Sequence, residues 1–184
     1  MRRRAAANYA GVAPSLLPKL TEPLLSVAFT KEDSAETASE SVLPDRPIPP
    51  GLNLVTAAGL KALEAQVESA RAAFEAARAH EDINERRRLS AVPLRDLRYF
   101  SERLRTAQLV PAPSSAETVA FGLTVTFTRD DGRTQTYRIV GEDEADPKSG
   151  TISHASPIAQ ALLGKSIGDL VSLGTQELEI TSIA

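Results

Sequence analysis

The sequence predicts an α+β protein in which an antiparallel helical hairpin (coiled coil) precedes a small antiparallel sheet with one short helix. Apolar residues recur at alternating spacings of three and four between residues 56 and 107, which indicates amphipathic helices. From Val119 the apolar residues alternate with small or polar ones, which indicates strands. Because proline-rich stretches precede the first pattern and separate the two, we divide the chain into residues 1–53, 54–110 and 117–184.

Residues 1–53 have the composition of a disordered tail. Residues 26–50 are rich in Ser, Glu, Thr and Pro, and such a segment cannot bury enough apolar surface to offset its ordering entropy. Three arginines follow Met1, but prolines interrupt the residues behind them, so no apolar core of a targeting signal is present. We expect an extended, proline-rich segment that leads into the first helix.

Residues 54–110 carry the hairpin pattern. Thr56 is a suitable N-cap for the first helix. An a/d seam sustained for about three heptads is typical of a coiled coil, and Pro111 and Pro113 then end the hairpin. The predicted seam residues are Leu60, Leu63, Val67, Ala70, Phe74 and Ala77 in the first helix, and Leu97, Phe100, Leu104 and Ala107 in the second.

The start of the second helix has two readings. If it begins near Asn84, Pro93 lies inside the helix and kinks it. If it begins near Ser90, Pro93 lies in the first turn, where its missing N–H costs nothing. The sequence supports both.

Residues 117–184 read as the sheet. Asp130-Asp131-Gly132 is a hairpin turn signal between the first two strands. Ser156 is an N-cap with Pro157 at the first helical position, which predicts a short helix that ends at Gly164. A small sheet with one helix makes an α+β domain. The expected strands are residues 119–127, 135–140, 151–153, 170–173 and 177–183.

An acidic loop lies between the second strand and the short helix. Its carboxylates belong to Glu142, Asp143, Glu144 and Asp146, and we expect them to be exposed. Charge alone favours a solvated loop with no further role.

The order of motifs in residues 137–164 closely resembles the carboxy-terminal domain of the Gre family of bacterial transcription elongation factors. The resemblance runs from about Val119 to the end and more loosely back to about Thr56. It implies that residues 117–184 have a fold similar to the FK506-binding proteins. The shared elements are Gly141, Asp143-Glu144-Ala145-Asp146, Ile152-Ser153, Ser156-Pro157 and Ala161-Leu162-Leu163-Gly164-Lys165.

The resemblance implies a cytoplasmic, monomeric bacterial factor that binds RNA polymerase and is not an enzyme in its own right. Its hairpin would enter the secondary channel and meet the transcript RNA and the DNA of the elongation complex only indirectly. It would need no cofactor of its own, because any Mg²⁺ would belong to the polymerase active site. The docking residues implied are Asp143, Glu144, Ala145, Asp146, Ser156 and Pro157.

The hairpin tip resembles the family tip in part. In the family, an Asp and a Glu three positions later help to hold a second Mg²⁺ that hydrolyses backtracked RNA; Asp82 and Glu85 match that pair. Glu81 replaces the family Gly, and Arg86 replaces the family Asn. The run Arg86-Arg87-Arg88 favours ion pairing with the carboxylates or contact with nucleic acid. The simpler reading of the acids is helix-start electrostatics.

Three alternatives remain open at this stage. The interval from Thr56 to Asp82 is about one heptad shorter than the family arm, roughly 10 Å of helix, and so resembles the nucleoside diphosphate kinase regulator branch, which binds polymerase without promoting cleavage. Peptidyl-prolyl isomerase activity is remote, because fold alone does not carry function and the chain has no Trp. A plain interaction module would show a concentration-dependent dimer.

Composition excludes several classes of protein. The net charge of -3 argues against a protein that coats nucleic acid. The absence of Cys excludes disulfides and thiolate metal sites, and two His are too few for a His-rich metal site. No apolar run approaches the ~20 residues that span a membrane, so we expect a soluble protein with no membrane contact.

Overall fold

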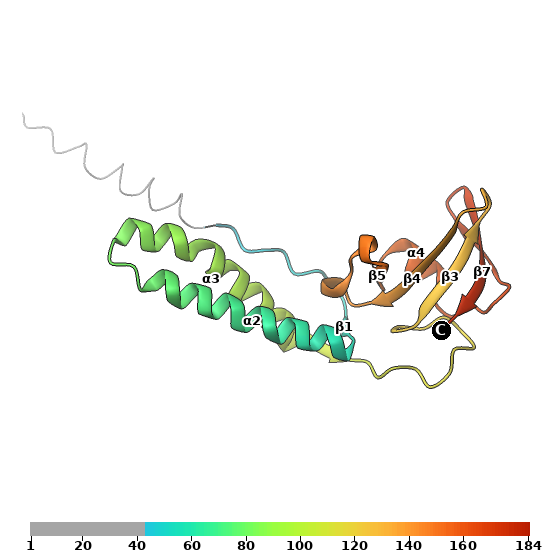
Figure 1. Ribbon diagram of the computed structural model, residues 1–184, viewed down its shortest axis with the longest axis horizontal. Coiled ribbons are helices and arrows are strands. Elements are labelled where there is room, and N and C mark those ends of the chain that lie inside the picture. Colours follow the sequence, from blue (N-terminus) through green and yellow to red (C-terminus); the bar gives the residue numbers. More distant parts are fainter. Residues whose placement is uncertain (1–42) are drawn as a thin grey trace, which may run out of the picture. The chain divides into compact units, whose positions relative to one another are not determined.

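The computed structural model describes residues 43–184, which belong to one compact unit (Figure 1). The predicted tail therefore lies outside the described residues up to residue 42. No helix in the described part is both long and apolar enough to cross a membrane. The first half of this unit contains β1 (Asn53–Val55), α2 (Ala57–Arg78), α3 (Ile83–Thr106) and β2 (Ala107–Leu109).

Helices α2 and α3 pack against each other as the predicted hairpin (Figure 1). Thr56 is the N-cap of α2, and its hydroxyl accepts a hydrogen bond from the Gly59 amide at 3.0 Å. At 1.5 Å per residue, the 22 residues of α2 are about 33 Å long. Four of the predicted seam residues of α2 are buried, namely Leu63, Val67, Ala70 and Ala77.

The second helix begins at Ile83, so Pro93 lies inside it. Its buried residues are Tyr99 and Arg103. The predicted seam residues Leu97 and Phe100 are only half-buried. In the C-terminal half of α3, the buried positions therefore lie one residue before the predicted seam positions. Tyr99 is buried in place of Phe100, and Arg103 in place of Leu104.

A two-stranded parallel ladder closes the base of the hairpin. Asn53 of β1 pairs with Ala107 of β2, which the sequence had placed in the helical seam. The Asn53 side-chain amide also donates a hydrogen bond of 2.6 Å to the carbonyl of Arg103, which is one of the last carbonyls of α3. The ladder thus fixes where both helical arms start and end.

The second half of the unit is the predicted α+β domain, with five strands in the order β5-β4-β3-β7-β6. The sheet is mixed, because β5 pairs parallel with β4 while all other neighbours are antiparallel. The physical reason is the acidic segment after β4, which returns the chain to the level of Arg138, so that β5 runs beside the last three residues of β4 in the same direction. The elements are β3 (Thr124–Arg129), β4 (Thr134–Val140), β5 (Thr151–Ser153), α4 (Pro157–Leu162), β6 (Leu170–Leu173) and β7 (Gln176–Ile183).

The first strand of the sheet is shorter than predicted. It starts at Thr124, because Gly122 turns the chain with a φ of 89°. Val119 and Phe121 are nevertheless buried, so the alternation that predicted a strand there reflects burial of an irregular segment.

The core lies on one face of this sheet. Val125 and Phe127 of β3 are fully buried on that face, next to Leu162 of α4. The opposite face of the sheet is polar: Thr126 and Thr136 hydrogen-bond each other across the strands at 2.9 Å. Ser156 caps α4 through the Ala159 amide, with Pro157 at the first helical position, as predicted.

Candidate docking site and hairpin tip

The acidic loop forms two short 3-10 turns, η1 (Glu142–Glu144) and η2 (Pro147–Ser149). The sequence predicts an exposed loop, but the side chains of Glu142 and Asp143 are only 22% and 14% exposed. Both carboxylates contact the hairpin through Arg103, whose side chain is 1% exposed. The expectation of four solvated carboxylates is therefore wrong for this part of the loop, because a buried cation from α3 meets it.

Arg103 makes two charge-assisted contacts across the junction. Its Nε lies 2.5 Å from Asp143 Oδ2, and its Nη2 lies 3.0 Å from Glu142 Oε2. Burial alone would lower the pKa of Arg103, but the hydrogen bond and the charge of Asp143 raise it above its ordinary value. The guanidinium thus stays charged and joins the hairpin to the sheet domain.

Glu144 joins the same two parts at the start of α2. Its carboxylate accepts hydrogen bonds from the Thr56 amide at 2.9 Å and from the Thr56 hydroxyl at 2.5 Å. A Cβ added to Gly59 would lie 2.0 Å from the Glu144 carboxyl carbon. Only a glycine at position 59 therefore leaves room for this carboxylate, which caps a helix that lies 88 residues away in the sequence.

A segment before the hairpin covers the outer side of this junction. We call residues 43–50 the N-terminal strap. The Arg46 guanidinium lies 3.7 Å from the centre of the Tyr99 ring and pairs with Asp96 at 3.6 Å. The Tyr99 hydroxyl in turn donates a hydrogen bond of 2.8 Å to Asp143. Burial and this hydrogen bond raise the pKa of Tyr99.

These contacts show what the sequence did not predict. Tyr99 and Arg103 are four positions apart and therefore lie on one face of α3. This spacing was the only feature of the sequence that could have indicated that they act together. Their partners lie about 40 residues further along the chain.

Asp146 is the exposed carboxylate of the loop. It accepts hydrogen bonds from the Lys148 amide at 3.1 Å and from the Ser149 hydroxyl. The Ser149 hydroxyl, followed by the Lys148 amide, lowers the pKa of Asp146. The side chain is therefore ionised near neutral pH and available at the surface.

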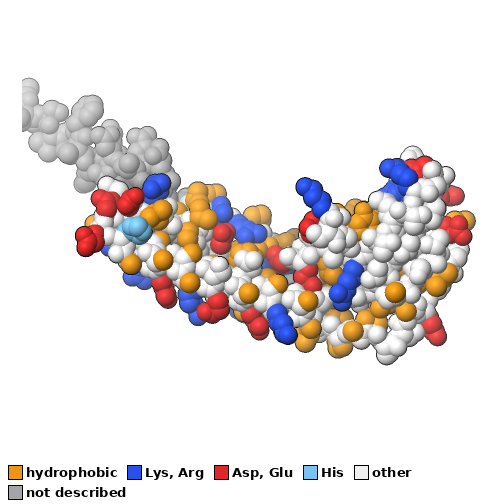
Figure 2. All heavy atoms as spheres, in the orientation of Figure 1, with side chains coloured by type: hydrophobic (Ala, Val, Ile, Leu, Met, Phe, Trp, Pro, Cys, Tyr) orange, Lys and Arg blue, Asp and Glu red, His pale blue; other side chains and the backbone are white. Residues whose placement is uncertain are grey.

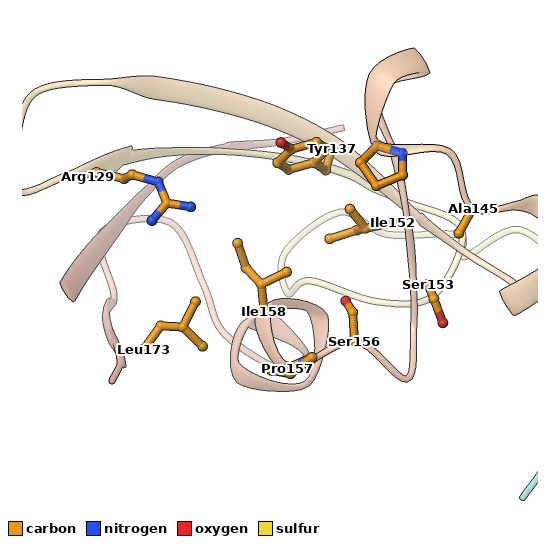
Figure 3. Close-up of a pocket in the computed structure, with 10 residues that line it drawn as sticks. Arg129, Tyr137, Ala145, Ile152, Ser153, Ser156, Pro157, Ile158 and Leu173 are labelled. Atoms are coloured by element: carbon orange, nitrogen blue, oxygen red, sulfur yellow. The ribbon is translucent and has the colours of Figure 1, made fainter. Parts of the chain in front are cut away.

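An apolar pocket of about 480 Å³ lies between this loop and α4. Figure 3 shows Arg129 at one end and Ala145 at the other, with Tyr137, Ile152 and Ile158 between them. The structure therefore brings together the predicted docking residues Ala145, Ser156 and Pro157 on one pocket, with Asp146 beside it. Asp143 and Glu144 are turned toward the hairpin instead.

The hairpin tip presents the predicted acids at the surface. Asp82 is the N-cap of α3, and its Oδ1 accepts a hydrogen bond from the Glu85 amide at 2.7 Å. Glu85 pairs with Arg88 at 3.5 Å and lies 3.8 Å from His80. Within residues 43–184, no group of three or more His, Asp or Glu side chains is placed to hold a metal ion. A metal at Asp82 and Glu85 would thus need further ligands from a partner.

Charge along the hairpin is mixed. Acidic and basic side chains alternate along the part of the molecule occupied by α2 and α3, on the face shown in Figure 2. Arg87 and Arg88 at the tip are exposed, and Arg86 is half-buried. This pattern fits a hairpin that stays in solvent or in a polar channel better than one that coats nucleic acid.

A comparison with known protein families identifies the class of protein to which the sheet domain belongs. The family model described as "Transcription elongation factor, GreA/GreB, C-term" matches residues 114–184, which include the whole sheet domain. The class is therefore that of transcription elongation factors. The relatives below extend the match into the hairpin, and the chain belongs to the GreA/GreB family.

This chain aligns with most of the length of several relatives named transcription elongation factor GreA. The protein from Maricaulis maris is 37% identical over 125 residues, which cover 61% of this chain and 80% of the relative. The Phenylobacterium zucineum protein is 34% identical over 149 residues, covering 70% and 95%. The Alkalilimnicola ehrlichii protein is 41% identical over 126 residues, covering 60% and 78%.

Solved structures give a weaker likeness. GreA factor homolog 1 (Gfh1) of Thermus thermophilus is 23% identical, with a TM-score of 0.35 over 73% of this chain and 99% of that one. A GreA/GreB factor from Nitrosomonas europaea is 17% identical with the same TM-score. At this score we draw no argument from the overlays.

Proposed function

We propose that the chain is a bacterial, cytoplasmic factor that binds RNA polymerase and inserts the α2–α3 hairpin into the secondary channel to modulate elongation. Membership of the GreA/GreB family supports the proposal. The single observation that carries it is the junction at Arg103, which ties the hairpin to the pocketed sheet domain. A partner that binds the pocket thereby also directs the hairpin. The chain acts as a monomer and needs no cofactor of its own.

The docking contact is assigned to the pocket and its rim. Ala145, Ser156 and Pro157 line the pocket, where they form part of its surface at the start of α4. Asp146 adds an ionised carboxylate beside it. Asp143 and Glu144 contribute by holding the loop, because their carboxylates are already bonded to the hairpin. A carboxylate at the rim affects mainly the association rate and its salt dependence.

A peptidyl-prolyl isomerase role is not favoured by this pocket. Tyr137 is the one aromatic residue among those that line it. A proline-binding site of that type needs several aromatic walls, so the pocket fits a docking role better.

At the tip, we propose regulation of elongation without stimulation of RNA cleavage. The Asp82 carboxylate is used as a helix cap, and Glu85 has Arg88 as a partner. The first arm of the hairpin also resembles a shortened family arm, because the interval from Thr56 to Asp82 is about one heptad shorter, roughly 10 Å of helix. Catalysis at a shared metal tolerates errors of only about 1 Å, so a shortened arm would leave the tip too far from the polymerase metal.

Cleavage assistance is the second candidate function. Asp82 and Glu85 retain the family spacing, lie in one helical turn and are both exposed. Mg²⁺ prefers such oxygen ligands and would be completed by the polymerase. Arg86, Arg87 and Arg88 would then lie near transcript phosphates.

Stalled, backtracked elongation complexes from the same organism distinguish the two. Cleavage of the transcript is measured with the wild-type chain, with the Asp82→Ala plus Glu85→Ala variant, and with the control Glu81→Ala. Polymerase binding without cleavage is the expected result. Cleavage that only the double substitution abolishes supports the second candidate, whereas the absence of any polymerase binding contradicts the whole proposal.

A further inference from the structure

We propose that Arg129 is a specificity-determining contact of the docking pocket, which binds a carboxylate of the polymerase segment seated there. The inference rests on the proposed function and deepens it. Arg129 was not among the residues that the sequence singled out. It lies at the end of β3 and lines the pocket at the end opposite Ala145 (Figure 3).

The position of Arg129 in the strand is unusual for a charged residue. Along β3, Val125 and Phe127 face the core and are fully buried, so alternation places Arg129 on the same face. A cation on the inner face of a sheet loses part of its hydration, which costs free energy unless an anion compensates it.

The side chains that hydrogen-bond Arg129 in the described part of the chain are neutral. Its Nε donates to the Gln135 side-chain oxygen at 2.6 Å, and its Nη1 donates to the side-chain oxygen of Gln176. Gln135 is held in turn by the Tyr137 hydroxyl at 3.2 Å. Within residues 43–184 no carboxylate forms a salt bridge with Arg129; the pKa of the exposed Asp131 is lowered chiefly by its hydrogen bonds with Arg133 and only to a smaller extent by the charge of Arg129. Two of the five N–H donors of a guanidinium are used, so three remain for a ligand.

This arrangement places the Arg129 guanidinium at the end of an apolar pocket, in a position to bind an anion. The two glutamines hold the guanidinium in place, which lowers the entropy cost of binding a carboxylate. Ala145 lies at the other end of the pocket, and the ionised Asp146 follows it in the loop just outside the lining. The pocket therefore has a cation at one end and a carboxylate beside the other end. This charge arrangement selects both the partner and the direction in which it binds.

The occupant that fits is a polymerase segment with an aliphatic side chain and an acidic residue beside it. The aliphatic group would lie among Tyr137, Ile152 and Ile158, and the carboxylate would meet Arg129. A basic residue at the other end of the segment would face Asp146. Charge complementarity at both ends makes this occupant fit better than a purely apolar one.

The test measures the affinity of the full-length chain for RNA polymerase core enzyme, at several salt concentrations. We expect Arg129→Gln to weaken binding about tenfold and Arg129→Glu about a hundredfold, because a desolvated charge contact is lost or reversed. Arg129→Lys should retain part of the affinity, because it keeps the charge but not the forked geometry. Arg129→Gln should also reduce the salt dependence of binding.

Arg138→Glu is the matched control, because Arg138 is exposed on the opposite face of the neighbouring strand. It should change affinity less than about threefold. Circular dichroism and melting curves establish whether each variant is folded. If Arg129→Glu does not fold, the affinities of the Arg129→Gln and Arg129→Lys variants test the inference.

Three results would overturn the inference. If wild-type chain binds polymerase and Arg129→Gln binds equally well, the inference fails while the proposed function stands. If wild-type chain does not bind, both fail. If sedimentation shows a dimer of the wild-type chain that Arg129→Glu abolishes, a second copy occupies the pocket instead of polymerase.

Discussion

Removing the Arg103 side chain should destabilise the chain and uncouple its two halves. Breaking a buried ion pair by removing one partner costs about 3–5 kcal/mol when the other charge stays buried. The Glu142 and Asp143 side chains are 22% and 14% exposed, so water partly compensates them and we expect about 2–3 kcal/mol for Arg103→Ala. For a chain of this length, that lowers Tm by about 4–12 °C.

Scanning calorimetry of the full-length chain is the assay, and Arg105→Ala is its matched control. Arg105 also forms a salt bridge, with Glu102 at 2.6 Å, but its side chain is 70% exposed. Exposed pairs contribute about 0–1 kcal/mol. Arg103→Ala should also broaden or split the transition, because the hairpin and the sheet domain lose their connection. The reasoning is refuted if Arg103→Ala shifts Tm no more than Arg105→Ala does.

Three further changes test the same junction. Gly59→Ala should lower stability by about 1–2 kcal/mol in urea unfolding, although Ala is normally about 1 kcal/mol better in a helix, because its Cβ displaces the Glu144 carboxylate from Thr56; a stabilised variant would contradict this. Tyr99→Phe should cost about 1–2 kcal/mol at pH 7. Because the folded state raises the pKa of Tyr99, that contribution is fully present below about pH 10 and lost as pH rises through the raised value; an equal difference between wild type and variant at pH 7 and pH 12 would refute it. Arg46→Ala should cost about 1 kcal/mol in melting curves, through the lost contact with the Tyr99 ring, and no change would mean that the strap does not stabilise the junction.

Local signals in the sequence predicted the local features of the fold. Thr56 and Ser156 are N-caps as expected, because capping depends on residues within one turn. Gly132 turns between β3 and β4 with a φ of 81°. The capping signal also predicted the short helix that begins at Ser156 and Pro157, and both residues line the pocket.

Features that depend on distant parts of the chain were not predictable in this way. The carboxylate of Asp143 was expected in solvent, but an arginine 40 residues earlier binds it. Arg103 itself has the polar character of a surface residue, and only its partners allow its burial. Similarly, the parallel pairing of β5 follows from the path of the acidic segment, which short-range patterns do not encode.

The most direct test of the proposal is to locate the tip on RNA polymerase. The chain has no cysteine, so Ile83→Cys at the exposed tip and Ser172→Cys on the exposed edge of the sheet each introduce a single attachment site. With a cleavage reagent attached to the thiol, the tip variant should cut polymerase segments that line the secondary channel near the active site, and the sheet variant should cut only outside the channel. Cuts by the tip variant confined to the outer surface, or no cuts from either variant, would contradict insertion of the hairpin.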